Sequence, residues 1–162
     1  MGASQKRPYN LRGMGDRPPR LAQIVYRDPV YFVTICTHQR KRLLATPAVQ
    51  TAFVRFARQG YATKRIAVGR YVIMPDHLHL FVALPEEQRV EQWARLLKQQ
   101  LGRAIPAAAP VWERGFFDHL LRSDESYAEK WEYVRRNPVR AGLVPTAEEW
   151  PFAGEIIAID RR

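Results

Sequence analysis

The hydrophobic positions of the chain follow two periods, and their order predicts one mixed α+β domain. Four segments rich in β-branched and aromatic residues predict strands, the first of them central because both of its faces are apolar: residues 31–37, 66–74, 77–84 and 116–122. Three segments with apolar residues every three or four positions predict helices: residues 47–60, 90–101 and 123–137. Pro75-Asp76 separates the second and third strands, which indicates a hairpin.

The first six elements run strand, helix, strand, strand, helix, strand, the β-α-β-β-α-β order of ferredoxin-like domains. This fold class is an antiparallel sheet with helices on one face, and an additional C-terminal helix follows it here. We expect the other face to stay open unless something covers it, and an open sheet face on a basic domain is a common platform for nucleic acid. The order places the domain at residues 30–152, between an irregular arm rich in Arg, Pro and Gly (residues 1–29) and a tail (residues 153–162).

Composition narrows the class of protein. The 162 residues include 26 Lys and Arg against 16 Asp and Glu, a net charge of +10 that favours a polyanionic partner, most commonly nucleic acid. Residues 1–42 hold nine basic and two acidic side chains, although a solvated basic tail on an ordinary enzyme would look the same. The single cysteine, Cys36, excludes an internal disulfide and a multi-cysteine zinc site. Neither a membrane span nor a secretory signal is evident, so we expect a cytoplasmic, nucleoid-associated protein without a membrane partner.

Two histidines in the third predicted strand are candidate metal ligands. Alternation along the strand places Leu78 and Leu80 on the core face and His77 and His79 together on the other. Imidazoles at i and i+2 are close enough to bind one metal ion, but a third ligand must come from elsewhere. The alternative is that both are polar residues on the solvent face of a half-buried strand.

The last predicted helix carries a second candidate group. Tyr127, Trp131 and Val134 form its apolar stripe, and Tyr133 lies about 110–120° from the centre of that stripe. Asn137, one turn on, shares the Tyr133 face, and both could address one ion or phosphate. The alternatives are a tyrosine at the rim of the core and an asparagine that caps the helix before a proline.

Four stretches in this order resemble the REP-associated tyrosine transposases, which belong to the HUH (His-hydrophobic-His) single-tyrosine transposases. They are FVTICTHQR at residues 32–40, YVIMPDHLHL at 71–80, FDHLLR at 117–122 after Trp112, and YVRRNPVRAGLV at 133–144. The resemblance covers about residues 30–152, and the family fold is the ferredoxin-like one.

The resemblance implies an enzyme that binds a hairpin formed by a palindromic repeat and cuts nearby single-stranded DNA. His77 and His79 would bind a divalent metal, with Asn137 as third ligand where some relatives have glutamine. Tyr133 would attack the phosphodiester and stay on the 5′ phosphate as a phosphotyrosine. Imidazole suits Mn²⁺ better than Mg²⁺, but Mg²⁺ is commoner in cells, so both metals remain open. His38 and His119 are candidates for accessory roles only.

Other functions and assemblies remain open. The chain could be a non-catalytic module that binds DNA or RNA hairpins, or a metal-dependent phosphodiesterase in which water attacks and the tyrosine is a spectator. It could act as a monomer or a homodimer, with the tyrosine working in its own subunit or in the partner's. The basic residues that we expect to contact DNA are Arg12, Arg17, Arg20, Arg27, Arg40, Lys98, Arg135 and Arg136.

The arm generates a first prediction. Deleting residues 1–28 should flatten the slope of log affinity against log salt concentration for hairpin DNA, because each lost phosphate contact removes about 0.7–0.9 from that slope. Fluorescence anisotropy at several salt concentrations measures it. An unchanged slope would mean that the arm is a solvated tail.

Overall fold

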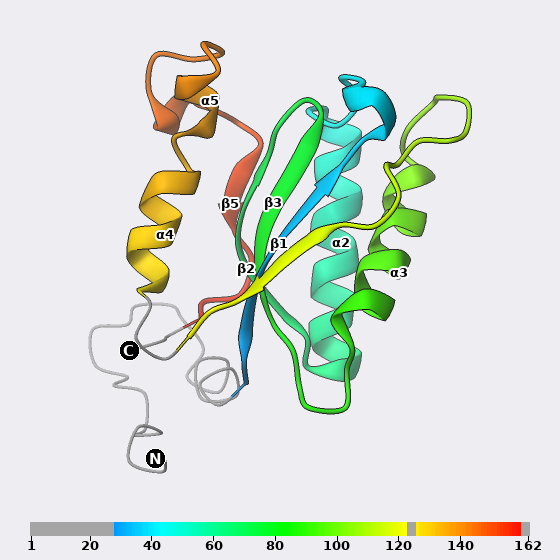
Figure 1. Cartoon of the computed structure of the whole chain (residues 1–162), viewed down its shortest axis with the longest axis vertical. Helices are drawn as coiled ribbons and strands as arrows, with labels where there is room; N and C mark the ends of the chain where they lie inside the picture. The colour runs from blue at the N-terminus through cyan, green and yellow to red at the C-terminus, as the bar shows by residue number, and fades with distance from the viewer. Residues whose placement is uncertain (1–27, 123–125, 160–162) are drawn as a thin grey trace.

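A computed structural model describes residues 28–122 and 126–159 of the chain, and its centre is one antiparallel sheet of five strands (Figure 1). In sheet order the strands are β4 (Phe117–Leu120), β1 (Val30–Cys36), β3 (His77–Ala83), β2 (Ala67–Ile73) and β5 (Ala153–Glu155). The order β4-β1-β3-β2 confirms the ferredoxin-like expectation, with β1 inside the sheet. β5 extends the sheet beyond β2.

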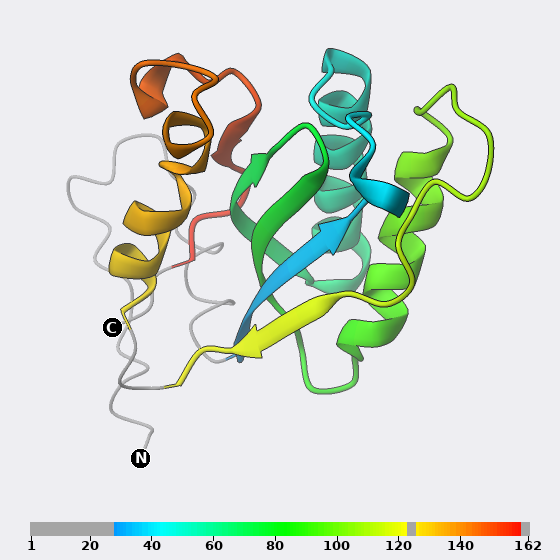
Figure 2. The same ribbon diagram turned by 45° about the horizontal axis from the view of Figure 1, so that its top comes forward.

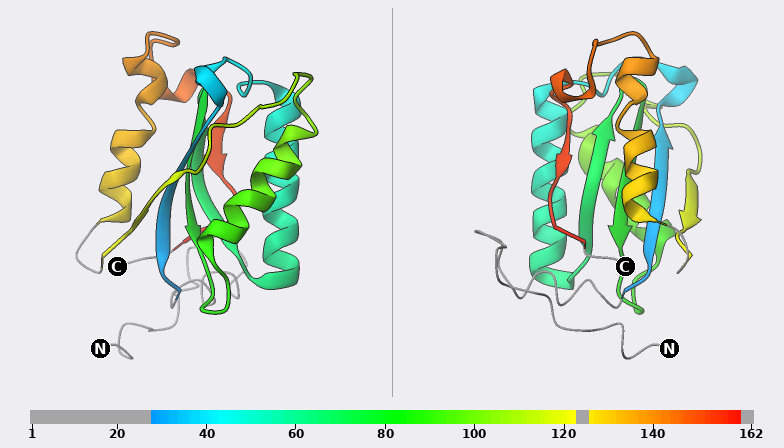
Figure 3. Two further views of the ribbon diagram at one scale, coloured as in Figure 1. Left: turned by 45° about the vertical axis from the view of Figure 1, so that its right-hand side comes forward. Right: turned by 90° about the vertical axis from the view of Figure 1, so that its left-hand side faces the viewer.

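Two long helices cover one face of the sheet. These are α2 (Pro47–Lys64) and α3 (Val90–Gly102), which lie together on the side away from α4 (Tyr127–Val134) (Figure 3, left). Their apolar faces enclose the main core with the even-numbered residues of β3. Fully buried members of this core include Phe53, Leu78, Leu80, Leu97 and Leu101. The leucine face of β3 is therefore the helix-covered face, as predicted.

α2 is longer than its sequence pattern indicates. Pro47 occupies the first turn, and the Thr46 hydroxyl accepts a hydrogen bond from the Val49 amide at 3.2 Å, as at a typical N-terminus. The helix passes Gly60, the expected end, and stops at Arg65, whose backbone is left-handed (φ 60°). A glycine costs a helix only about 1 kcal/mol, so it does not have to end one.

The second face of the sheet does not stay open, because α4 covers it. α4 packs against it through Tyr127 and Val134, which belong to a second buried cluster together with Phe81 and Ala83 of β3. Figure 3 shows α4 on the opposite side of the sheet from α2 and α3. His77 and His79, near the end of the sheet where β3 begins, stay partly accessible on this face.

A β-bulge in β2 fits α4 to the sheet. The pairing of β2 with β3 shifts between Val68 and Tyr71. At this irregularity the amide of Arg70 donates a hydrogen bond to the Tyr127 hydroxyl at 3.0 Å. The Tyr127 ring also packs edge-on against Phe81, with ring centroids 4.8 Å apart. The first turn of α4 is therefore held by both a polar and an apolar contact.

The predicted helix over residues 123–137 is two helices. α4 is capped by Ser126, whose hydroxyl accepts from the Glu129 amide at 3.0 Å, whereas Ser123 lies outside the described residues. The chain turns at residues 135–136 and continues as α5 (Asn137–Arg140). Pro138 explains the break, because proline lacks an amide proton and its ring would clash with the preceding turn of a continuous helix. In the first turn of α5 the same proline is tolerated.

Residues 153–159, which the sequence analysis places in a C-terminal tail, pack on the sheet. β5 pairs with β2, and the amides of Ile156 and Ile157 donate to the carbonyls of Gly69 and Val68. Ile157 and Ile159 are buried against the α4 side of the sheet. The segment is too short to show a strand period, which is why the sequence pattern did not predict it.

The close approach of α4 and the C-terminal segment at Gly69 generates a prediction. A Cβ at this position would lie 2.5 Å from the Tyr127 hydroxyl oxygen and 2.8 Å from a side-chain carbon of Ile159. Gly69→Ala should therefore lower the free energy of unfolding by about 1–3 kcal/mol through overpacking. Urea unfolding measures it, with Gly60→Ala as control. That change meets its nearest atom at 3.9 Å and should be neutral or stabilising.

Candidate active site

The two histidines of β3 form the centre of the candidate site. Because side chains alternate along a strand, His77 and His79 emerge on the face opposite to the main core. Their ring centroids are 4.6 Å apart and the rings meet edge to face. Both side chains are partly buried, so the pair lies in a shielded position beside α4 and not on an open surface.

His79 is held by the neighbouring strand. Its Nδ1 is hydrogen-bonded to the Thr34 hydroxyl at 2.7 Å, and its ring stacks on Phe32 with centroids 5.3 Å apart. Burial lowers the pKa of His79 to about 3, and the positive charges of His77, Arg140 and Arg40 act in the same direction. The imidazole is therefore neutral at physiological pH, the form in which histidine binds a metal.

His77 is oriented by a carboxylate. Oδ1 of Asp76 lies 2.8 Å from Nδ1 of His77, and Oδ2 accepts a hydrogen bond from Nε of Arg40 at 3.0 Å. Burial lowers the pKa of His77, although the Asp76 carboxylate opposes that shift. Burial also acts to raise the pKa of Asp76, but the hydrogen bonds from His77 and Arg40 outweigh it and hold that pKa below its usual value.

The chemistry of this pair fits a divalent metal. The Asp76 carboxylate, 2.8 Å from Nδ1 of His77, favours the tautomer with the proton on Nδ1 and an available lone pair on Nε2, against an Arg40 guanidinium nitrogen that lies 3.3 Å from the same Nδ1. The Nδ1 of His79 is likewise held by a protein partner, the Thr34 hydroxyl. Such outer partners fix the rotation of ligating histidines. In residues 28–122 and 126–159, however, no third His, Cys, Asp or Glu joins them in a metal-binding group.

Tyr133 and Tyr127 face opposite ways on α4, as the helical period predicts. Tyr127 is 6% exposed and points into the sheet, whereas Tyr133 is 67% exposed. The ring of Tyr133 is covered on one side by Arg140, whose guanidinium carbon lies 3.9 Å from the ring centroid. The charge of Arg140 also acts to lower the pKa of His79, so this arginine that covers Tyr133 is near enough to the histidine pair to affect its charge.

Asn137 does not share a helix with Tyr133, contrary to expectation, because the chain breaks before α5. It begins α5, and its side-chain oxygen accepts a hydrogen bond from the Arg140 guanidinium. Tyr133 and Asn137 are therefore connected through Arg140. Sequence analysis missed Arg140 because it ended the helix before Pro138 and predicted no element beyond that proline. The available signal was its spacing of three residues from Asn137 with no acidic residue close by in the sequence.

The basic residues expected to contact DNA have different environments. Arg135 is paired with Glu132 and Glu148, and Arg40 with Asp76, so each already has a carboxylate partner. Lys98 donates to the backbone carbonyls of Glu113 and Gly115, and this lysine belongs to α3 on the far side of the sheet. These two contacts hold the segment around Glu113–Gly115, and a role of Lys98 at the DNA stays a prediction.

Arg136 is exposed beside the site and fits the expectation best. The arm residues Arg12, Arg17, Arg20 and Arg27 lie outside the described part of the chain. His38 belongs to the 3₁₀ helix η2 (His38–Arg40), and His119 is exposed on the edge strand β4. Neither joins the histidine pair in a metal-binding group of the described residues.

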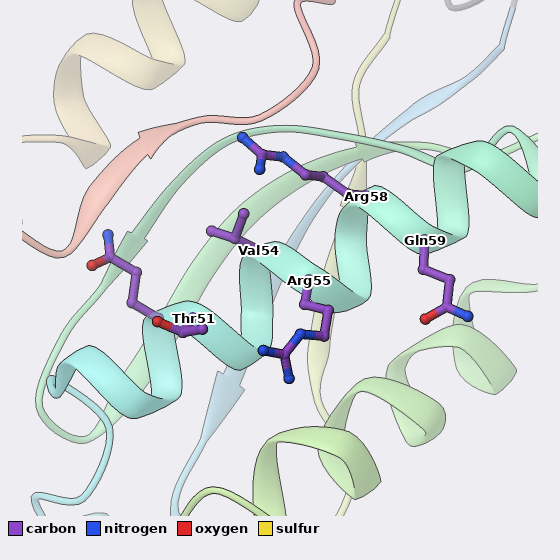
Figure 4. A pocket seen from close by; sticks show the side chains of 6 residues that line it. Thr51, Val54, Arg55, Arg58 and Gln59 are labelled. Carbon is purple, nitrogen blue, oxygen red and sulfur yellow. The ribbon is translucent and has the colours of Figure 1, made fainter.

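Two hollows of the described surface lie on the helix-covered side. A groove of about 790 Å³ runs between α2 and α3, lined by Arg55, Lys64 and Arg103 among others. A shallower concavity of about 710 Å³ on α2 is lined by Arg55 and Arg58 (Figure 4). Within the described residues neither lining includes an Asp or Glu. Both hollows are basic and lie across the sheet from His77 and His79.

The described part of the chain includes no helix with the length and apolar content needed to cross a bilayer.

Comparison with known proteins identifies the family. Residues 26–135 match the family described as IS200-like transposases. A REP-associated tyrosine transposase of Escherichia coli K12 is 27% identical over 128 residues, covering 76% of this chain and 74% of the relative. A Haemophilus influenzae protein provisionally given the same name is 28% identical over 143 residues, covering 76% of this chain and 78% of the relative.

A solved structure of a REP-associated tyrosine transposase bound to a REP hairpin has the same fold. The TM-score is 0.65 at 26% sequence identity, and the match covers 79% of this chain and 78% of that one. The family match extends over both histidines and reaches Tyr133 and Arg135, and thus spans the site from β3 to the end of α4. The chain belongs to the IS200-like transposase family, and within it to the REP-associated tyrosine transposases.

Proposed function

We propose that the protein cuts and rejoins single-stranded DNA next to palindromic-repeat hairpins, with Tyr133 as the nucleophile. The observation that carries the proposal is a pair of neutral histidines, oriented through Nδ1, on the sheet face that α4 covers. Tyr133 is the exposed tyrosine of that helix. The hairpin substrate is supported by the structural neighbour, which is a transposase bound to a REP hairpin.

In the proposed reaction one bond forms and one breaks at phosphorus. The Tyr133 hydroxyl oxygen bonds to the phosphorus and loses its proton to solvent, while the bond from phosphorus to the 3′ oxygen breaks. The leaving oxygen keeps the electron pair and takes up a proton. The product is a 5′-phosphotyrosine that a 3′ hydroxyl can attack in reverse, so the strand can be rejoined. Attack by water would cleave the same bond but leave no covalent intermediate for rejoining.

Nε2 of His77 and Nε2 of His79 would hold the divalent metal, Mg²⁺ or Mn²⁺. When bound, the metal would supply positive charge to the phosphate and the leaving oxygen. Thr34 and Asp76 keep the two rings rotated for this task through their contacts with Nδ1. Burial keeps both imidazoles unprotonated, so they do not have to lose a proton before binding.

The metal assignment can be tested directly. His79→Ala should abolish cleavage and weaken Mn²⁺ binding at least about tenfold, while hairpin affinity stays within a few-fold because phosphate neutralisation supplies most of it. Calorimetric Mn²⁺ titration, gel assays and anisotropy measure the three quantities. His119→Ala, on the edge strand, is the control and should change none of them. Undiminished cleavage by His79→Ala would reject the assignment.

The nucleophile can be tested at one atom. Tyr133→Phe keeps the ring and its stacking on Arg140 but removes the hydroxyl. Cleavage and the covalent protein–DNA adduct should both disappear on denaturing gels, while binding of hairpin and Mn²⁺ persists.

Tyr127→Phe is the matched control on the same helix. It leaves the Arg70 amide without its acceptor, so we expect a loss of about 1–3 kcal/mol of stability but a normal adduct at 25 °C. An adduct that survives in Tyr133→Phe and vanishes in Tyr127→Phe would contradict the proposed function.

A further inference from the structure

Arg140 occupies the junction of all the groups discussed above. Its guanidinium carbon lies over the Tyr133 ring, 3.9 Å from the centroid, and the guanidinium donates a hydrogen bond to the side-chain oxygen of Asn137. Its charge acts on His79. One arginine therefore contacts the proposed nucleophile, holds the expected third metal ligand and lies near the histidine pair.

The charge of Arg140 is not neutralised by a carboxylate. Arg135 is paired with Glu132 and Glu148, and Arg40 with Asp76. In the described part of the chain Arg140 forms no such ion pair, although its side chain is exposed. A guanidinium has five N–H groups in a planar fork, and Asn137 takes up one edge of it here. The remaining N–H groups can donate to an anion beside Tyr133.

We propose that Arg140 binds a non-bridging oxygen of the scissile phosphate next to Tyr133, and that Asn137 orients Arg140 and does not complete the metal's ligand set. The inference rests on the proposed function, because it concerns the same phosphate. Arginine is suited to this task since its planar fork matches two phosphate oxygens and its charge is permanent.

The arrangement at Asn137 argues against a metal ligand. An amide oxygen that accepts a hydrogen bond from a guanidinium faces a positive charge, and a divalent cation at the same oxygen would be repelled by that charge. The same hydrogen bond instead restricts the rotation of the long Arg140 side chain. Asn137 is therefore a positioning residue, which acts on the phosphate through Arg140.

The backbone of α5 holds the two side chains in this relation. Asn137 and Arg140 are three residues apart and lie on the same face of the turn. Pro138 between them is buried and fixes the helix, while the amide of Arg140 donates to the carbonyl of Arg136 at 2.9 Å. The break between α4 and α5 therefore sets the position of Arg140 over Tyr133, because a single continuous helix would place residue 140 differently relative to that ring.

The first experiment separates phosphate binding from metal binding by comparing three variants, Arg140→Gln, Arg140→Lys and Asn137→Ala. Single-turnover adduct formation should fall about 10²–10³-fold in Arg140→Gln, as for loss of one charge-stabilising donor. Arg140→Lys should recover part of that loss, and Asn137→Ala should lose about tenfold. Calorimetric Mn²⁺ affinity should stay within twofold in all three. Arg95→Gln, on α3 across the sheet, is the charge-matched control and should behave as wild type.

The second experiment needs no catalysis. A hairpin oligonucleotide with a single-stranded flank should bind more tightly than the hairpin alone, and Arg140→Gln should reduce this gain while leaving the affinity for the bare hairpin unchanged. In the double variant Arg140→Gln/Asn137→Ala, the asparagine change should have no further effect, since its role passes through the arginine.

Two results would overturn the inference. One is that Asn137→Ala weakens Mn²⁺ binding as much as His79→Ala does, which would make Asn137 a metal ligand. The other is that Arg140→Gln forms the adduct and binds the flank like wild type. Failure of the proposed function has a different signature, because wild-type protein would then give no adduct while the flank measurement still decides the role of Arg140.

Discussion

The alternation of side chains along β3 is the constraint on which the rest of the structure depends. One set of positions, including Leu78 and Leu80, closes the main core under α2 and α3. The other set carries His77 and His79 at one end of the strand and Phe81 farther along it. A register slip of one residue would exchange the two sets and place both imidazoles in the hydrocarbon core. Core packing and histidine placement are therefore one requirement.

On the second face of the sheet, α4 is firmly packed and still exposes one tyrosine, Tyr133, to solvent. α4 is attached through Tyr127, which reaches the bulge in β2, and through Val134 at its other end. Tyr133 then has to point away from the sheet because it lies outside that apolar stripe. Phe81 links the two halves, since its ring contacts Tyr127 on one side and Phe32, the residue stacked on His79, on the other.

The sequence was sufficient for what depends on local periodicity. The common face of His77 and His79 and the outward position of Tyr133 follow from periods of 2 and 3.6 residues. The ferredoxin-like arrangement follows from the order of the predicted strands and helices, and the hairpin from the break at Pro75-Asp76. The sequence was insufficient where contacts between residues far apart in the chain determine how the elements pack. Nothing local shows that α4 covers the second face, since the contact joins Tyr127 to the Arg70 amide, 57 residues away.

The parts of the site that the sequence did not predict have the same origin. Pro138 indicates in the sequence that a helix is interrupted. A proline is found both after the end of one helix and in the first turn of the next, so the sequence alone does not show that α5 begins there. The roles of Arg140 and of the Asp76 carboxylate depend on their hydrogen bonds with Asn137 and His77, which the sequence pattern does not show. By contrast, the nucleophile, metal and third-ligand assignments came from the family resemblance and stay predictions.

The strand β4 has a property unlike the others, because all four of its residues are exposed and it forms the edge of the sheet beside β1 (Figure 2). Phe117 is 71% and Leu120 48% exposed, so their side chains add little to folding. The pairing is fixed by the backbone ladder and by the next residue, Leu121, which is buried and whose amide donates to Val30. Mutational tolerance at Phe117 and Leu120 therefore measures contacts with molecules outside the domain, while at Leu121 it measures the fold itself.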